Sequence, residues 1–392
     1  MLFLSRVLAG FLLVCGWIGS APASGMTPEE AATRLFAAQK VERGWFSHQG
    51  LASAVPPLVA ELRESLGDFQ RVSPCTEVCV ALYTGGEFTF NITIDDDGLI
   101  AGLLIDVPIS YATSLSEALA AFEALSGEVS VVVTQEATVL GALNMDRPMA
   151  VGSAFKLAVL KALQKLIGAG KLDWDQVVRF EDKWRSLPSG QMQDWPERAP
   201  VTLHTLASLM ISVSDNTATD ALIDLVTRNS VEGRAPRNRP FLTTREFFLL
   251  KHRDHDAYRE QFSAGDYDLK VDVLRALADK PLPRISELVM VPFPGVEWFF
   301  STNELCELMD DLGDLDVMKI NPGVARRSDW ASVAFKGGSD VGVINLTTGL
   351  LTEDGTRYCV SATWNDDKAV DEEGFSILYA SLLHQLKAKA MP

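Results

Sequence analysis

The chain has 392 residues, carries a formal net charge of -17 at pH 7, and is 47% hydrophobic and 22% charged. At roughly 100 to 200 residues per domain, this length indicates two globular domains. The acidic balance offers no basic surface for phosphates, which argues against nucleic acid as a partner and against an anionic membrane surface. GxSxG, HExxH, phosphate-loop and dinucleotide-binding motifs do not occur in the sequence, which removes several large enzyme classes.

Residues 1–24 have the pattern of a secretory signal peptide. Arg6 precedes an apolar run over residues 7–18, and small residues suited to cleavage follow at positions 21–23. The apolar run is shorter than the roughly 20 residues that a membrane span needs. We therefore expect export to the periplasm or the medium, with no stable membrane insertion after the signal is removed.

Residues 25–110 are predicted to form a small α+β domain. Thr27, Pro28 and Glu30 supply an N-cap, a proline at the first helical position and a capping-box glutamate, for a helix that runs to about Lys40. One more helix and three strands follow, at residues 58–66, 78–83, 87–94 and 99–105. Apolar and polar residues alternate along the middle strand, so its apolar face needs a cover, which the two helices would supply.

Four cysteines remain after the signal peptide. Cys75 and Cys79 are close enough in sequence to close a small disulfide loop in an oxidising compartment. A metal site is less favoured there, because no second cysteine pair or paired histidine completes four ligands. We interpret Cys306, in a helical pattern, and Cys359, in a strand pattern, as buried free thiols.

Residues 111–392 form the second expected domain. Ser114 and Glu117 open a helix by the same capping logic, and strands are predicted at 129–134 and 138–143. A long helical middle, late strands and a final helix from about Glu373 follow. Helices that lie between early and late strands indicate an α/β domain whose sheet is assembled from strands at both ends of the sequence.

Ser153 and Lys156 lie three residues apart at the start of an apolar helix that is predicted to end near Ile167. Both side chains would share one helix face. A neutral hydroxyl is a poor nucleophile, and a lysine can serve as its base if burial or a second cation lowers the lysine pKa. Free N–H groups at the helix start could hold an oxyanion. About one SxxK is expected by chance in such a chain, so an N-cap serine with a surface lysine is the alternative.

The sequence Ser214-Asp215-Asn216 is a rarer signal, with a chance expectation well under about one in ten per chain. The Ser214 hydroxyl could relay a proton to a leaving group. The Asn216 amide could bind a substrate carbonyl and the nearby lysine. A helix cap is the alternative, since all three residue types are good caps.

A third element, Lys336-Gly337-Gly338-Ser339, lies in a strand-like stretch over residues 332–344. Consecutive glycines there would let a substrate backbone approach closely. Lys336 would anchor a substrate carboxylate and would also lower the pKa of Lys156. A simple bulge or turn is the alternative.

The three motifs occur in the order SxxK, SDN and KxG, and together they resemble those of class A serine β-lactamases and penicillin-binding proteins. The resemblance covers about residues 115–390 and implies a three-layer α/β, β-lactamase-like domain. It implies Ser153 as the nucleophile, Lys156 as the base and Ser214 as the proton relay. It also implies Asn216 as a substrate and lysine contact and Lys336 as the carboxylate anchor. The backbone N–H groups of Ser153 and Ser339 would form the oxyanion hole. Gly337 departs from the usual threonine.

The N-terminal domain is similar to small α+β domains of the NTF2, steroid-isomerase or cystatin-like type. Its pairing with this hydrolase resembles the β-lactamase-like esterase of clavulanic-acid gene clusters. The sequence gives no convergent acid and base within that domain. We therefore expect a packing or substrate-gating role rather than isomerase activity.

Class A enzymes carry an E-x-x-L-N loop after SDN, whose glutamate drives deacylation. Here Glu246 and Leu249 give half of that motif, and Leu250 replaces the asparagine. Glu246 is the tentative deacylation base, and a charged residue at a helix start is the alternative. The longer stretch at residues 251–296 is expected to form a lid or wall.

These observations predict an exported serine hydrolase that acts by acyl transfer through Ser153 on β-lactams or esters, with no cofactor and no metal. A peptidoglycan D,D-peptidase or transpeptidase is one alternative. A non-catalytic β-lactam-binding or sensor protein is the other. In each case the expected partner is a small β-lactam, ester or peptidoglycan-like molecule, and the oligomeric state stays open.

Overall fold

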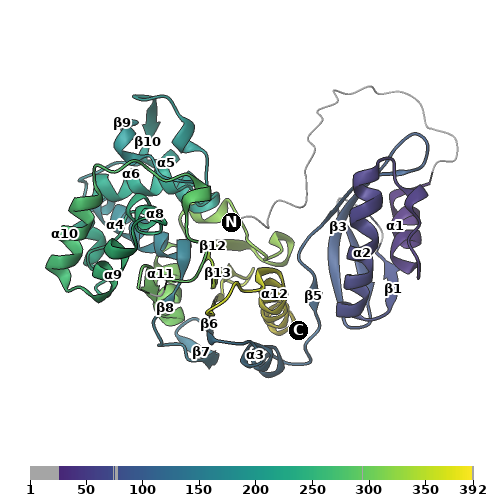
Figure 1. The fold of residues 1–392 in the computed structure, drawn as a ribbon. Coiled ribbons are helices and arrows are strands. Elements are labelled where there is room, and N and C mark those ends of the chain that lie inside the picture. The colour runs from purple at the N-terminus through teal and green to yellow at the C-terminus, as the bar shows by residue number, and fades with distance from the viewer. Residues whose placement is uncertain (1–25, 74, 76–77, 294, 391–392) are drawn as a thin grey trace. The chain divides into compact units, whose positions relative to one another are not determined.

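The computed structural model describes residues 26–73, 75, 78–293 and 295–390. The chain forms two compact units, one made of the residues up to Ala118 together with those from Glu373 onward, and the other of Leu119–Glu372 (Figure 1). The expected signal peptide lies outside the described residues. Within them, no helix is both long and apolar enough to cross a membrane.

The first unit begins with two helices that precede an antiparallel sheet. The helices are α1 (Pro28–Ala37) and α2 (Gln49–Leu66), with a short 3-10 turn η1 (Arg43–Trp45) between them. The strands are β1 (Phe69–Val72), β2 (Cys79–Tyr83), β3 (Gly86–Ile94), β4 (Ile100–Ile105) and β5 (Ile109–Ser110). Strands β1 to β4 pair in chain order, and β5 pairs with β3.

The apolar face of β3 is covered as the alternation predicts. The ring of Phe36, on α1, lies 5.1 Å from those of Phe88 and Phe90, edge to face in both cases. The predicted N-terminal capping box is also present, because Thr27 and Glu30 cap each other's backbone at the start of α1. Local sequence therefore places this helix correctly.

Helix α2 begins at Gln49, well before the expected start at Leu58, and continues through Pro56 and Pro57. A proline inside a helix removes a backbone hydrogen bond, so a helix seldom continues through two of them. An apolar stripe at helical spacing runs through both halves and is buried in the unit's core. Its members are Ala52, Val55, Val59, Leu62 and Leu66.

The C-terminal helix α12 (Glu372–Ala390) begins one residue before the expected Glu373. Within the first unit, its His384 ring stacks on Tyr111 at 5.2 Å, and Gln385 Nε2 donates to the carbonyl of Ala112 at 2.7 Å. Helix α3 (Leu115–Glu123) starts with Ser114 capping Glu117 N, as expected.

The second unit is built on a five-stranded antiparallel sheet in the order β12-β13-β14-β6-β7. Its strands are β6 (Glu128–Gln135), β7 (Thr138–Leu143), β12 (Ser332–Asp340), β13 (Val343–Leu351) and β14 (Arg357–Asn365). Early and late strands thus share one sheet, as the sequence predicted, because β14 pairs with β6. The strand expected over residues 332–344 is two strands, because the chain reverses at Gly342, whose φ of 74° suits glycine.

The chain between β7 and β12 is mostly helical (Figure 1). Its helices form one apolar core with the sheet. They are α4 (Lys156–Gly168), α5 (Leu203–Ser212), α6 (Asn216–Val226), α7 (Arg228–Glu232), α8 (Thr244–Leu250), α9 (Asp256–Ala264), α10 (Tyr267–Leu277) and α11 (Thr302–Leu312). Two short ribbons pair β8 (Met149–Ala150) with β11 (Phe299–Phe300), and β9 (Val177–Arg179) with β10 (Pro200–Thr202). The 3-10 turns are η2 (Gly152–Phe155), η3 (Asp182–Trp184), η4 (Met192–Asp194), η5 (Ile285–Glu287), η6 (Asp316–Lys319) and η7 (Arg327–Asp329).

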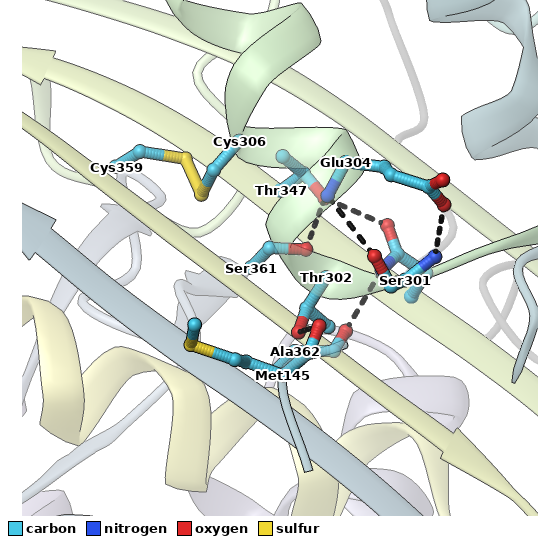
Figure 2. Close-up of a disulfide and its surroundings, with 10 residues drawn as sticks. Met145, Ser301, Thr302, Glu304, Cys306, Thr347, Cys359, Ser361 and Ala362 are labelled. Carbon is cyan, nitrogen blue, oxygen red and sulfur yellow. Dashed lines mark hydrogen bonds between the residues drawn. A yellow bond between two sulfur atoms is a disulfide. The ribbon is translucent and has the colours of Figure 1, made fainter. Parts of the chain in front are cut away.

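The interpretation of Cys306 and Cys359 as free thiols is wrong. Helix α11 packs across β13, β14 and β6, which places Cys306 against Cys359, and the two are joined by a disulfide with a Cα–Cα distance of 5.7 Å (Figure 2). Neither local pattern contains this information, because the two residues are 53 positions apart. In the first unit, a second disulfide joins Cys75 to Cys79.

Candidate active site

A tight turn presents the SxxK motif. Strand β8 pairs with β11, and Val151 N donates to the carbonyl of Trp298 at 3.0 Å, which fixes the chain just before the turn η2. Gly152 has a φ of 49°, which suits a glycine, and the α-helix begins at Lys156. Ser153 is half-buried within the turn η2, whereas Lys156 is fully buried on the first turn of α4.

Lys156 connects the first motif to the second. Its ammonium donates to Ser214 Oγ at 3.0 Å, to the Ser214 carbonyl at 2.7 Å and to Asn216 Oδ1 at 2.7 Å. These three acceptors satisfy all three donors of an ammonium group. The side chain is therefore held in one place at the start of α6.

The environment of Lys156 favours its neutral form. Burial lowers the pKa of Lys156 well below its ordinary value, and the positive charge of Lys336 lowers it further. The negative charges of Asp215 and Asp220 act in the opposite direction, with a smaller effect. A lysine with a lowered pKa can accept a proton at neutral pH, which is the property that the sequence required of a base.

Ser214 sits at the centre of the site in a strained conformation. Its φ of 56° is uncommon for a residue with a Cβ. Its carbonyl accepts from Ser189 Oγ at 2.6 Å as well as from Lys156. Next to it, the buried Asp215 carboxylate accepts from the backbone N–H groups of Gln191 and Met192 at 2.8 and 2.9 Å. These contacts hold the Ser214 hydroxyl between the two lysines.

Lys336 brings the third motif to the same hydroxyl. Its ammonium donates to Ser214 Oγ at 3.1 Å and to the Gly337 carbonyl, and only 2% of the residue is exposed. Burial lowers the pKa of Lys336 to about 7. Ser214 Oγ is therefore a shared hydrogen-bond partner of both lysines, and the structure brings together the residues that the three motifs singled out.

The glycines of the third motif serve the protein's own packing. A Cβ on Gly338 would lie 2.3 Å from the Val151 carbonyl and 2.4 Å from Ser153 N, and one on Gly152 would lie 2.8 Å from Ser339 N. The sequence predicts that the glycines of this motif admit a substrate backbone. Gly338 instead admits the turn η2 against β12, and together with Gly152 it lets the backbone of Ser153 lie beside that of Ser339.

Glu246 is held at the start of α8. One carboxylate oxygen accepts from Thr243 N at 2.8 Å in a capping box, and the other accepts from Arg228 at 2.6 Å. Its hydrogen bonds therefore go to a helix cap and an ion pair rather than to Ser153 or Lys156. This arrangement corresponds to the alternative, a charged residue at a helix start.

Sequence reasoning gave no role to the buried Asp220. Burial raises the pKa of Asp220 to about 7, and its carboxylate accepts from Thr244 N at 2.7 Å and from Arg245 N at 2.8 Å. Asp220 thereby fixes the start of α8 beside α6 and near Lys156. No local signal marks it, since its partners lie on another helix. Across the described ranges, no cluster of histidine, cysteine or carboxylate side chains is arranged to hold a metal ion.

Comparisons with known proteins relate part of this unit to a family. Residues 113–267, which include Ser153, Lys156 and Ser214, match the family model described as the Beta-lactamase enzyme family. The match covers less than half of the chain and ends before Lys336. This segment of the chain is therefore β-lactamase-like in sequence. No curated protein matches the chain.

Several solved structures are similar in arrangement at low identity. A β-lactamase from Sphaerobacter thermophilus DSM 20745 is 18% identical, with 71% of this chain and 98% of that chain covered and a TM-score of 0.49. PBP-A is 14% identical, with 70% and 95% covered and a TM-score of 0.47. A β-lactamase from Chitinophaga pinensis DSM 2588 is 17% identical, with 70% and 97% covered and a TM-score of 0.45.

Proposed function

We propose that the chain is an exported serine hydrolase that transfers acyl groups through Ser153. The observation that carries this proposal is the buried amine of Lys156, whose Nζ lies at the start of the Ser153 helix, 3.0 Å from Ser214 Oγ and 2.7 Å from Asn216 Oδ1. The match of residues 113–267 to the β-lactamase family supports the same reaction class.

In the proposed reaction, neutral Lys156 accepts the hydroxyl proton of Ser153 as the Ser153 oxygen bonds to the substrate carbonyl carbon. The carbonyl oxygen becomes an oxyanion, which the N–H groups of Ser153 and Ser339 would stabilise. The proton then passes through the Ser214 hydroxyl to the leaving group as the bond to that group breaks. Water later attacks the acyl carbon and gives a proton to Lys156, which returns it to the Ser153 oxygen as the acyl–serine bond breaks and the acid is released.

The substrate class follows from the cations and from Glu246. Lys336 is suited to anchor a substrate carboxylate, as in a β-lactam, whereas Lys156 can act as the base in the acylation of any ester. Glu246 is already engaged with Thr243 and Arg228, so we propose that it does not activate the deacylating water. A bulky β-lactam remnant would keep water from Lys156, whereas a small acyl group would leave room. We therefore expect slow β-lactam turnover and faster turnover of short-chain esters.

For the first unit we propose an NTF2-type fold with a packing or gating role. Two helices on a five-stranded antiparallel sheet, with an aromatic core of Phe36, Phe88 and Phe90, support this proposal. A serine hydrolase preceded by such a unit would resemble the β-lactamase-like esterase of clavulanic-acid gene clusters.

The test is intact-mass spectrometry of the protein during incubation with a cephalosporin and with a short-chain activated ester. A mass increase equal to one acyl group, located on Ser153 after digestion, is the expected result. Ser153→Ala should abolish labelling, and Ser212→Ala, which removes a hydroxyl from the neighbouring helix α5, should not. Labelling of another residue, or undiminished turnover in Ser153→Ala, would refute the proposal.

A further inference from the structure

A second buried ionic cluster lies at the end of β12, outside the set of residues described so far. The Lys251 ammonium forms an ion pair with the Asp340 carboxylate, and the Glu297 carboxyl lies within hydrogen-bonding reach of Asp340. Lys251 is 2% exposed and Glu297 is 8% exposed. The three residues come from separate segments: Lys251 follows α8, Glu297 precedes β11, and Asp340 ends β12.

The Glu297 carboxyl is poorly supplied with hydrogen-bond donors. Neither of its buried oxygens makes a well-formed hydrogen bond to a described residue, and the backbone N–H of Trp298 acts on it only weakly. An ionised carboxylate without donors is costly to bury, and two adjacent carboxyls lower that cost by sharing one proton. Burial raises the pKa of Glu297 well above its ordinary value, the charge of Asp340 raises it further, and Lys251 opposes both. With the proton on Glu297, its hydroxyl can donate to Asp340.

The cluster joins the two backbone segments that carry the candidate oxyanion donors. Asp340 directly follows Ser339 on β12. It lies on the same strand face as Gly338, roughly 7 Å further along the strand. On the other side, Glu297 directly precedes Trp298, which accepts from Val151 N at 3.0 Å just before Ser153.

The contacts of Trp298 make that second connection rigid. Its ring stacks on Phe155, within η2, with ring centroids 3.9 Å apart, and its Nε1 donates to the Leu242 carbonyl at 3.1 Å. A displacement of Glu297 is therefore transmitted to the turn that holds Ser153. The carbonyl of Lys251 in turn accepts from Val289 N at 3.0 Å, which ties the backbone at Val289 to the same point.

We propose that Lys251, Asp340 and Glu297 form a clamp that sets the separation of Ser339 N from Ser153 N, with Glu297 and Asp340 sharing one proton. The inference rests on the proposed function, because it gives the clamp a role in that acyl transfer. The three are positioning residues, since they act through the backbone of Ser339 and of Trp298 rather than on reacting atoms.

The clamp makes acylation dependent on pH. The groups that face Glu297 are Asp340 on β12 and Lys251 after α8. Glu372 interacts with Asp340 through its charge and with Ser339 through a hydrogen bond. As pH rises through the raised pKa of Glu297, the shared proton is lost and two adjacent carboxylates repel each other. The folded state keeps this proton where the unfolded chain has lost it, so its stabilising effect is complete at acidic pH and decreases as pH rises.

Glu297→Gln tests the clamp, because glutamine has the shape of protonated glutamate and cannot lose a proton. The acylation rate with a neutral short-chain ester is measured from pH 5 to pH 9 in the wild type and the variant. We expect equal rates at acidic pH and a rate ratio, variant over wild type, that rises about tenfold toward pH 9, because small misplacements of reacting groups cost 10- to 100-fold in rate. Glu181→Gln, at an exposed carboxyl, is the matched control.

Asp340→Asn removes the charged partner of Lys251 at every pH. The acylation rate of this variant is expressed per acylated active site, so that misfolded protein does not lower the measured rate. We expect a loss of about 10- to 100-fold in acylation with KM for the ester little changed. A ratio for Glu297→Gln that stays flat across pH, or an Asp340→Asn variant that acylates at the wild-type rate, would overturn the clamp while labelling of Ser153 persists. Labelling that survives Ser153→Ala would instead overturn the proposed function.

Discussion

Replacement of Lys336 by methionine tests how the two lysines divide their roles. Both ammonium groups donate to Ser214 Oγ, at 3.0 Å from Lys156 and 3.1 Å from Lys336. Two such bonds to one oxygen place the nitrogens about 5 Å apart. At an effective dielectric constant of about 20, two unit charges at that distance repel by about 3 kcal/mol. A repulsion of this size favours the neutral form of Lys156.

The sign of the effect follows from the charge that is removed. Lys336, with a pKa of about 7, is protonated below that pH, and its charge then lowers the pKa of Lys156. Without it, Lys156 keeps its proton to higher pH and is a base over a narrower range. The acid limb of the pH-rate profile for acylation should therefore move to higher pH in Lys336→Met, by about 1 to 2 units.

Stopped-flow acylation with an ester that carries no carboxylate isolates this effect, because substrate anchoring by Lys336 then plays no part. Lys165→Met, which removes an exposed charge from the same helix as Lys156, is the control and should leave the profile in place. An acid limb that does not move, or that moves to lower pH, would refute the electrostatic argument. A loss seen only with a carboxylate-bearing cephalosporin would assign Lys336 to anchoring alone.

Three further changes have defined outcomes. Glu246→Gln should leave deacylation rates nearly unchanged in stopped-flow assays. It should lower the free energy of unfolding by about 1 to 2 kcal/mol, because it weakens a helix cap and the ion pair with Arg228. A long-lived acyl-enzyme in this variant would instead identify Glu246 as the hydrolytic base. Replacing Cys306 and Cys359 together by serine should cost about 4 kcal/mol of unfolding free energy for a loop closed between positions 53 apart, and an unchanged midpoint in a denaturant titration would contradict this. Gly338→Ala should reduce Ser153 acylation by about 100-fold or more, since its methyl would lie 2.3 Å from a backbone oxygen, and wild-type labelling would contradict that packing.

The candidate site was partly predictable because much of it is encoded locally. Ser153 and Lys156 are three residues apart, so a helix start brings them to one face wherever that helix lies. The sequence could not show that Ser214 Oγ contacts both Lys156 and Lys336. Those contacts join residues 58 and 122 positions apart, and they depend on how α6 and β12 pack around α4.

Long-range pairs account for what sequence reasoning missed or misjudged. The sequence predicts Cys306 and Cys359 to be buried free thiols, because each suits the apolar pattern of its own helix or strand. Only the packing of α11 on the sheet brings the two together as a disulfide. Glu297 and Asp340 likewise lie in unremarkable local contexts. The buried Glu297 carboxyl becomes informative only when the fold places it beside Asp340 and leaves its own oxygens without a well-formed hydrogen bond.

The sequence by itself determined the features whose interactions span a few residues. The capping box of Thr27 and Glu30, the apolar alternation of β3 and the first turn of α4 are of this kind, because a helix turn and a strand pleat are set by near neighbours. Tertiary structure alone decided the extent of α2, where burial of an apolar stripe outweighs two prolines. It also decided the Cys306–Cys359 bridge and the environment that lowers the lysine pKa values, since burial and charge proximity arise only when distant segments pack together.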